Sequence, residues 1–137
     1  MSDVFYNKTV TVYNKISTGG VVGSAVWYPT VLTDARLIVS KGANITKSGI
    51  ESADSAKLSV RKLDDYLEPI EWKQSSDKAS HFTFSEDGDF FVEGDTSAED
   101  STQSGFYAYM KTHYDNCFKV TTCDRFYLIP HLEVGGK

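Results

Sequence analysis

Histidine, cysteine and acidic side chains are the groups in this sequence that could bind a metal or take part in catalysis. The three histidines, His81, His113 and His131, lie far apart, and none has the HxH or HExxH spacing of a zinc site. Cys117 and Cys123 are six residues apart. A single strand through both would separate them by about 20 Å, too far for a disulfide. We therefore expect free thiols that pack as small apolar side chains.

An acidic segment is a second candidate for cation chemistry. Residues 86–100 contain seven Asp or Glu and no Lys or Arg. Within them, Asp87-Gly88-Asp89 resembles a fragment of a calcium loop, but it lacks the D-x-[DN]-x-[DN]-G order of an EF-hand. We interpret the segment as a solvated loop face, or as a surface that repels phosphate or meets a basic partner.

The motifs of nucleotide binding and acyl transfer are incomplete in this sequence. Gly19, Gly20 and Gly23 are not followed by the Gly-Lys-Ser/Thr of a phosphate-binding loop, and no Gly-x-Ser-x-Gly elbow occurs. Carboxylates are plentiful, but no pair stands out by its spacing. We therefore expect that the protein is not an enzyme and that it uses no metal or other cofactor.

The composition is that of one folded domain spanning residues 1–137. Hydrophobic residues make up 40% and aromatic residues 13% of the chain, which suits a core built on pleated, half-buried surfaces. The net charge of −5, without a basic cluster, argues against a protein that wraps DNA. The N-terminus lacks a signal-peptide pattern, and the longest apolar runs, residues 25–28 and 126–129, have four residues. We therefore expect no export and no membrane span.

Alternation of polar and apolar residues predicts a chain made mostly of strands. Residues 8–15 alternate strictly, with Val10 and Val12 on one face. Residues 25–39 are extended as well, but Pro29 has no backbone N–H to donate. This predicts either one kinked strand or two strands broken near Pro29.

The middle of the chain contains two interruptions of the strand pattern. Residues 41–55 are rich in Ser, Asn, Asp and Gly, and they predict a long ordered loop, or a short helix inside a loop. Loops of this length are usually functional. Residues 56–63 alternate again. Residues 81–84 and 90–93 are aromatic runs on either side of an Asp-Gly pair, which predicts a hairpin.

The C-terminal part predicts one helix and a last pair of strands. Phe106, Tyr109, Met110 and His113 follow the spacing of an amphipathic helix. Two strands, residues 117–122 and 125–134, would then meet in a tight turn at Asp124. The expected fold is mainly β, a small barrel or sandwich of about six to seven strands. One short helix lies in the C-terminal half, and a long loop follows the second strand.

Tyrosine and tryptophan are more numerous than one small core needs. Such side chains, when left outside, favour contacts between protein subunits. The residues alone therefore predict an interaction module that assembles with itself. The candidate subunit interface consists of Trp27, Tyr28, Trp72, Tyr107 and Tyr114.

Several short segments, taken in order, resemble those of a known group of structural proteins. They are residues 9–15 (TVTVYNK), 28–32 (YPTVL), 36–38 (RLI), 52–58 (SADSAKL), Trp72, 88–94 (GDFFVEG), 114–116 (YDN) and 130–137 (PHLEVGGK). The chain is similar to head-closure (stopper) or minor capsid-type proteins of the head–tail connector in long-tailed bacteriophages and Firmicutes prophages.

The resemblance implies a function without catalysis. Proteins of this group form a homo-oligomeric ring between the portal or adaptor and the tail, and the ring closes the DNA exit of the capsid. DNA passes through without sequence-specific binding, and the protein is located in the virion after assembly in the host cytoplasm. Their extended loop would correspond here to residues 41–55. The candidate gating residues are Gly42, Asn44, Lys47, Ser48, Gly49, Glu51 and Asp54.

Two other functions stay open on the sequence. A neighbouring role, as a tail-completion protein or a minor capsid protein elsewhere on the shell, would use the same kind of fold. From a different class, a metal- or carbohydrate-binding β module could be built on the acidic loop and the aromatic side chains.

Overall fold

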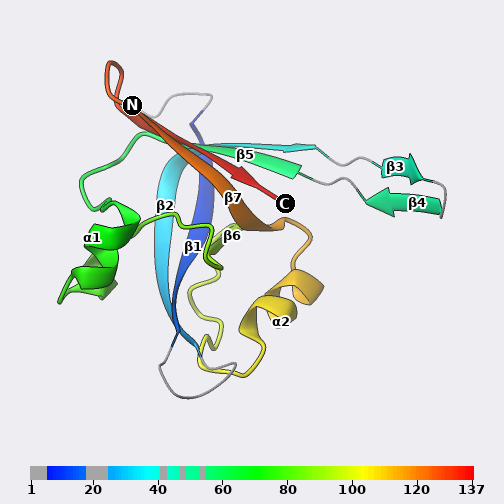
Figure 1. The fold of residues 1–137 in the computed structure, drawn as a ribbon, viewed down its shortest axis with the longest axis horizontal. Helices are drawn as coiled ribbons and strands as arrows, with labels where there is room; N and C mark the ends of the chain where they lie inside the picture. The colour runs from blue at the N-terminus through cyan, green and yellow to red at the C-terminus, as the bar shows by residue number, and fades with distance from the viewer. Residues whose placement is uncertain (1–5, 18–24, 41–42, 47–48, 53–54) are drawn as a thin grey trace.

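The computed structural model describes residues 6–17, 25–40, 43–46, 49–52 and 55–137, and the description below concerns these residues. Figure 1 shows the strands and helices that these residues form. They are β1 (Lys8–Ser17), β2 (Ala25–Ser40), β3 (Ala43–Thr46), β4 (Gly49–Ser52), β5 (Ser55–Val60), α1 (Pro69–Gln74), the 3-10 helix η1 (Lys78–Ser80), β6 (Phe90–Glu93), α2 (Phe106–His113), β7 (Cys117–Phe126) and β8 (His131–Gly136).

Six of these strands close into an antiparallel barrel in the order β1-β2-β5-β8-β7-β6. This confirms the mainly β prediction and decides for a barrel over a sandwich. Strand β2 changes its partner along its length and so connects two parts of the barrel. Residues 25–35 pair with β1, and residues 36–40 pair with β5. The change of partner lies beside a register shift opposite Lys8 and Val10, where Asp34 has a φ of 55°. A bulge of this kind bends a strand and lets a small sheet close on itself.

The barrel interior is filled by the alternating apolar residues of its strands. Val10, Val12 and Leu58 are fully buried there, as the period-2 pattern predicts. Gly136 also faces this core, and a Cβ at its position would lie 2.8 Å from Cβ of Phe118. Glycine is therefore the residue that fits where the last strand meets the aromatic side chains.

The outer face of β1 is buried as well, which the alternation alone did not indicate. Tyr13 packs against Phe90 and Phe106 beneath α2, with ring centroids 4.9 Å and 5.0 Å apart. Thr11 donates to the carbonyl of Gly94 at 2.8 Å. Phe90, Phe106 and Gly94 cover this face with both apolar and polar contacts, so β1 runs through the centre of the molecule.

Three details of the predicted elements are corrected by the structure, and one is confirmed. The helix over residues 106–113 is confirmed. Residues 81–84 do not pair with 90–93 in a hairpin, because β6 pairs with β1 and β7 instead. The turn predicted at Asp124 is wrong, because β7 continues through it to Phe126.

The third correction concerns the long segment after β2. The sequence predicted a long ordered loop or a short helix inside a loop, but its described residues 43–46 and 49–52 pair as the hairpin β3–β4. Pro29 lies inside one continuous strand, in the part of β2 that pairs with β1 alone. Its missing N–H therefore faces an unpaired edge, as the physical argument requires.

Candidate functional site

The hairpin β3–β4 is the part of the candidate gating segment that the structure describes. It leaves the barrel between β2 and β5 and projects away from it (Figure 1). Asn44 pairs with Glu51, and Thr46 pairs with Gly49. The candidate residues Gly42, Lys47, Ser48 and Asp54 lie outside the described residues.

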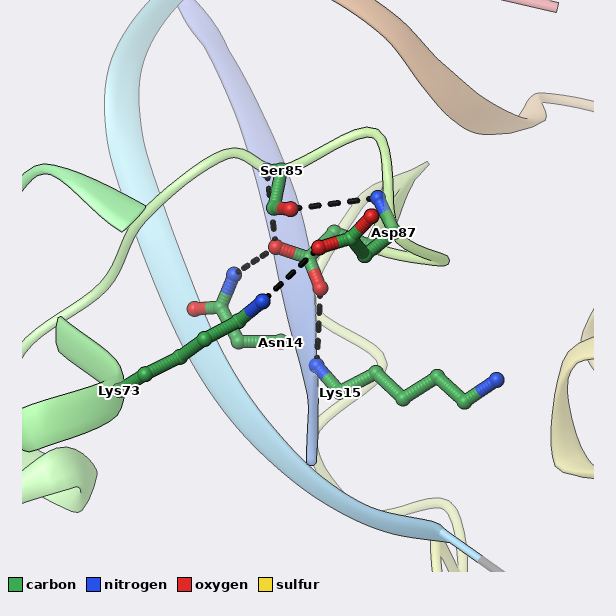
Figure 2. A network of polar contacts seen from close by, with 6 residues as sticks. Asn14, Lys15, Lys73, Ser85 and Asp87 are labelled. Atoms are coloured by element: carbon green, nitrogen blue, oxygen red, sulfur yellow. Dashed lines mark hydrogen bonds and ion pairs between the residues drawn. The ribbon is translucent and has the colours of Figure 1, made fainter. Parts of the chain in front are cut away.

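A buried carboxylate forms the centre of a polar network at the side of the barrel (Figure 2). Asp89 is 2% exposed and accepts three hydrogen bonds of 2.9 Å each, from Nδ2 of Asn14 and from the backbone N–H groups of Lys15 and Ser85. Burial raises the pKa of Asp89, and these hydrogen bonds oppose the rise. Three of the acceptor positions of the carboxylate are therefore used inside the protein.

Asn14 connects this carboxylate to a neighbouring segment. Its Nδ2 donates to the carbonyl of Thr83 at 2.6 Å, and its Oδ1 accepts from the backbone N–H of the same residue at 3.2 Å. Nearby, Lys73 of α1 forms an exposed ion pair with Asp87 at 2.8 Å, which lowers the pKa of that carboxyl. The network attaches residues 83–89 to β1, and we interpret it as a structural anchor.

Two further carboxylates of the acidic segment accept hydrogen bonds within local turns. Asp95 accepts from the N–H and hydroxyl of Ser97, and Asp100 accepts in the same way from Thr102. These bonds lower the pKa of both carboxyls. Within the described residues, no group of three or more His, Cys, Asp or Glu is placed to hold a metal ion.

The two cysteines lie in one strand, β7, as the spacing argument assumed. Both are free thiols, with Cys117 buried and Cys123 half-buried. Burial raises the pKa of each to about 11. At neutral pH they are therefore protonated, in the state of an unreactive core thiol.

The five aromatic residues proposed for a subunit interface occupy different environments. Trp72 is corrected to a core residue, because it is 1% exposed and its Nε1 donates to the carbonyl of His81 at 3.2 Å. Tyr28 packs on it, with ring centroids 5.6 Å apart. Trp27 and Tyr107 both lean on Phe90. Apart from Trp72, all of these residues are half-buried, namely Trp27, Tyr28, Tyr107 and Tyr114. An interface role for these four stays a prediction.

A run of strongly exposed apolar residues lies where the sequence predicted a strand. Tyr127, Leu128 and Ile129 form the turn between β7 and β8, and Leu128 is 97% exposed. Together with Phe126 they make four consecutive apolar side chains on the surface, which we call the apolar tip. The apolar run itself is the signal in the sequence, but its pattern predicts the interior of a strand.

The base of the apolar tip is held by specific contacts. His131 stacks on Phe126 with ring centroids 4.7 Å apart, and its Nδ1 lies 2.8 Å from the carbonyl oxygen of Ile129. Arg125 lies 5.0 Å from the ring of Tyr127 and forms an ion pair with Glu68 at 3.0 Å. The turn is thus an ordered projection of the barrel.

The fold defines a small closed antiparallel β-barrel with a projecting hairpin and an apolar tip. The chain belongs to a family of unknown function, DUF6751, whose model matches residues 5–137. Neither a comparison with curated proteins nor one with solved structures finds a match. Over the described residues, no helix combines the length and apolar character that crossing a bilayer requires.

Proposed function

We propose that this protein is a structural component of a phage head–tail connector, a head-closure protein that assembles into a ring at the capsid DNA exit. The observation that carries the proposal is the hairpin β3–β4, which projects from a closed barrel between β2 and β5. It lies in residues 41–55, the segment to which the resemblance gives the gating role. A tail-completion or minor capsid position would use the same architecture and is the nearest alternative.

The barrel suits a role in assembly for a physical reason. Its six strands form a closed sheet, and the stretch of β2 that pairs with β1 alone contains Pro29, which has no N–H to donate to an added strand and so discourages uncontrolled association at that edge. The hairpin β3–β4 and the apolar tip are projecting parts available for contacts between copies. A two-stranded hairpin is marginal alone in water, and neighbouring copies in a ring would stabilise it.

The charge of the chain agrees with DNA passing through such a ring. The net charge is −5, and residues 86–100 contribute four exposed carboxylates, those of Glu86, Asp87, Asp95 and Asp100. A negative surface repels phosphate, so DNA can slide past without the retention that Lys and Arg would cause. The partners implied are further copies of this chain, the portal or adaptor, and the tail proteins.

Mass measurement tests the proposal. Analytical ultracentrifugation of the full chain, alone and mixed with portal, adaptor and tail proteins of the same phage, is expected to show a closed oligomer of defined mass. A chain that stays monomeric in every mixture would contradict a connector role. A calcium titration followed by thermal shift tests the binding-module alternative, for which Asp89 is unsuited because its acceptors are already used.

A further inference from the structure

Strand β7 has a free edge over its C-terminal half. On one side it pairs with β8 as far as Phe126, but on the other side β6 pairs only with residues 117–119. The backbone carbonyl of Asp89 adds one contact beyond β6, because it accepts from the N–H of Val120 at 2.9 Å. From residue 121 onward, none of the described strands pairs with this edge, and every residue except the half-buried Cys123 is exposed. An unpaired edge of this kind is a template for a strand from another chain.

The backbone groups that face this free edge follow from the pairing of β7 with β8. Lys119 exchanges two backbone hydrogen bonds with the chain end after β8, and Val120 then faces away from β8. The register shift between Val120 and Thr122 inserts one extra residue, so two successive residues face β8 there. Alternation resumes after the bulge. The N–H and C=O groups of Cys123 and Arg125 therefore point to the free edge.

A hollow of about 340 Å³ lies beside this edge. Cys123 lines it from β7, and the other lining residues come from residues 66–69 and 84–87. Asp89, which follows the second of these segments, is in contact with β7 through its carbonyl. The hollow therefore lies next to the part of β7 whose outward backbone groups are unpaired.

The charges around the hollow favour a basic occupant. Its charged lining residues are Glu68, Glu86 and Asp87, and no Lys or Arg lines it. Arg125 forms an ion pair with Glu68 at 3.0 Å. Lys73 forms another with Asp87 at 2.8 Å (Figure 2). Glu86 is exposed and has no ion pair with another described residue. A Lys or Arg side chain would supply its missing partner, whereas an acidic side chain would be repelled.

We infer that β7 binds an extended segment of another protein, which adds a strand at the free edge and places a basic side chain in the hollow. Hydrogen bonds to the backbone of Cys123 and Arg125 supply affinity, and the hollow selects the charge. The stretch of β2 that pairs with β1 alone contains Pro29, whereas residues 121–126 contain no proline, so β7 is the edge open to pairing. The inference does not depend on ring formation and goes beyond the proposed function.

Residue-resolved amide hydrogen exchange tests the free edge. The probe is a short capped peptide of alternating threonine and valine with one central lysine, and the matched control has glutamate in place of the lysine. Added in excess, the lysine peptide is expected to slow exchange at Cys123 and Arg125 roughly tenfold, and the glutamate peptide much less. Unchanged exchange at both residues would overturn the inference. Protection that appears without peptide as the protein concentration rises would assign the edge to a second copy and also overturn it.

A matched pair of charge substitutions tests the hollow. Glu86→Lys reverses the charge of the carboxylate that lacks an ion pair. Glu133→Lys is the control, because Glu133 is an exposed carboxylate on β8 that does not line this hollow. In a titration followed by NMR, Glu86→Lys is expected to weaken binding of the lysine peptide roughly tenfold, and Glu133→Lys to leave it unchanged. Equal affinities of the two variants would show that the hollow does not receive the basic side chain.

A second pair of variants tests the backbone contact. Cys123→Pro removes an N–H that faces the free edge and leaves the pairing with β8 in place, whereas Cys123→Ala keeps that N–H. The thermal transition first shows whether each variant is folded. We expect the alanine variant to bind the lysine peptide and the folded proline variant to lose it. Equal binding by both would contradict strand addition at β7, and if the proline variant does not fold, the exchange and charge experiments still decide.

Discussion

The side-chain amide of Asn14 donates a 2.9 Å hydrogen bond to the buried carboxylate of Asp89, across 75 residues of sequence. This contact joins β1 to the turn that precedes β6, two segments that meet only in the folded barrel. The backbone N–H groups of Lys15 and Ser85 complete the set of donors. A buried group with this many partners is expensive to remove.

Asp89→Ala is expected to destabilise the protein by about 3 kcal/mol, because it leaves several buried donors without an acceptor. The measurement is the free energy of unfolding from urea titration. Asp87→Ala is the control two residues away, since its ion pair with Lys73 is exposed and should matter little. Equal losses for the two variants would show that the buried network is not the anchor.

Stability is expected to fall as the pH rises from 9 towards 11. Burial raises the pKa of the Cys117 thiol from its ordinary value of 9 to about 11, and that of the Tyr13 hydroxyl from 10 to about 12. The unfolded chain ionises first, so the stabilisation present below pH 9 is lost as the pH rises through the folded values. Thermal midpoints measured across this range test the effect. Cys117→Ala should flatten the decline, and an unchanged slope would assign the decline to other groups.

Val12→Asp is expected to abolish folding. Val12 is fully buried in the barrel interior, and an unpaired carboxylate there costs more than most single substitutions. Val26→Asp is the matched control, because Val26 lies on β2 with its side chain exposed. Circular dichroism and a cooperative thermal transition measure folding. A soluble, cooperatively melting Val12→Asp chain would mean that the strand phase is wrong.

Replacement of residues 41–54 by Asn-Gly is expected to leave the barrel folded and to produce particles that leak DNA. Ser40, the last residue of β2, pairs with Ser55, the first residue of β5, so a two-residue turn can join them. The thermal transition checks the fold, and nuclease-sensitive DNA in assembled particles checks the gate. Tight, infectious particles from this variant would exclude a gating role for the hairpin.

Local sequence patterns determined those parts of the fold that depend on neighbouring residues. The alternation in residues 8–15 predicted β1, and the spacing of Phe106, Tyr109, Met110 and His113 predicted α2. Each pattern reflects a contact made within one element or with one face of it. The mainly β class followed from the same signals.

Closure of the barrel and burial of single side chains were decided by the tertiary structure. Pairing of β5 with β8 and of β1 with β6 joins segments far apart in the chain, and no local pattern encodes such a partner. The sequence predicted Trp72 on the surface, but in the structure η1 and Tyr28 pack against it. The apolar tip shows the reverse case: its four apolar residues suited a strand interior, but the register of β7 with β8 ends at Phe126 and leaves the other three in an exposed turn. A local sequence pattern indicates which environment a residue prefers, whereas the exposure of its side chain depends on which distant segments pack against it.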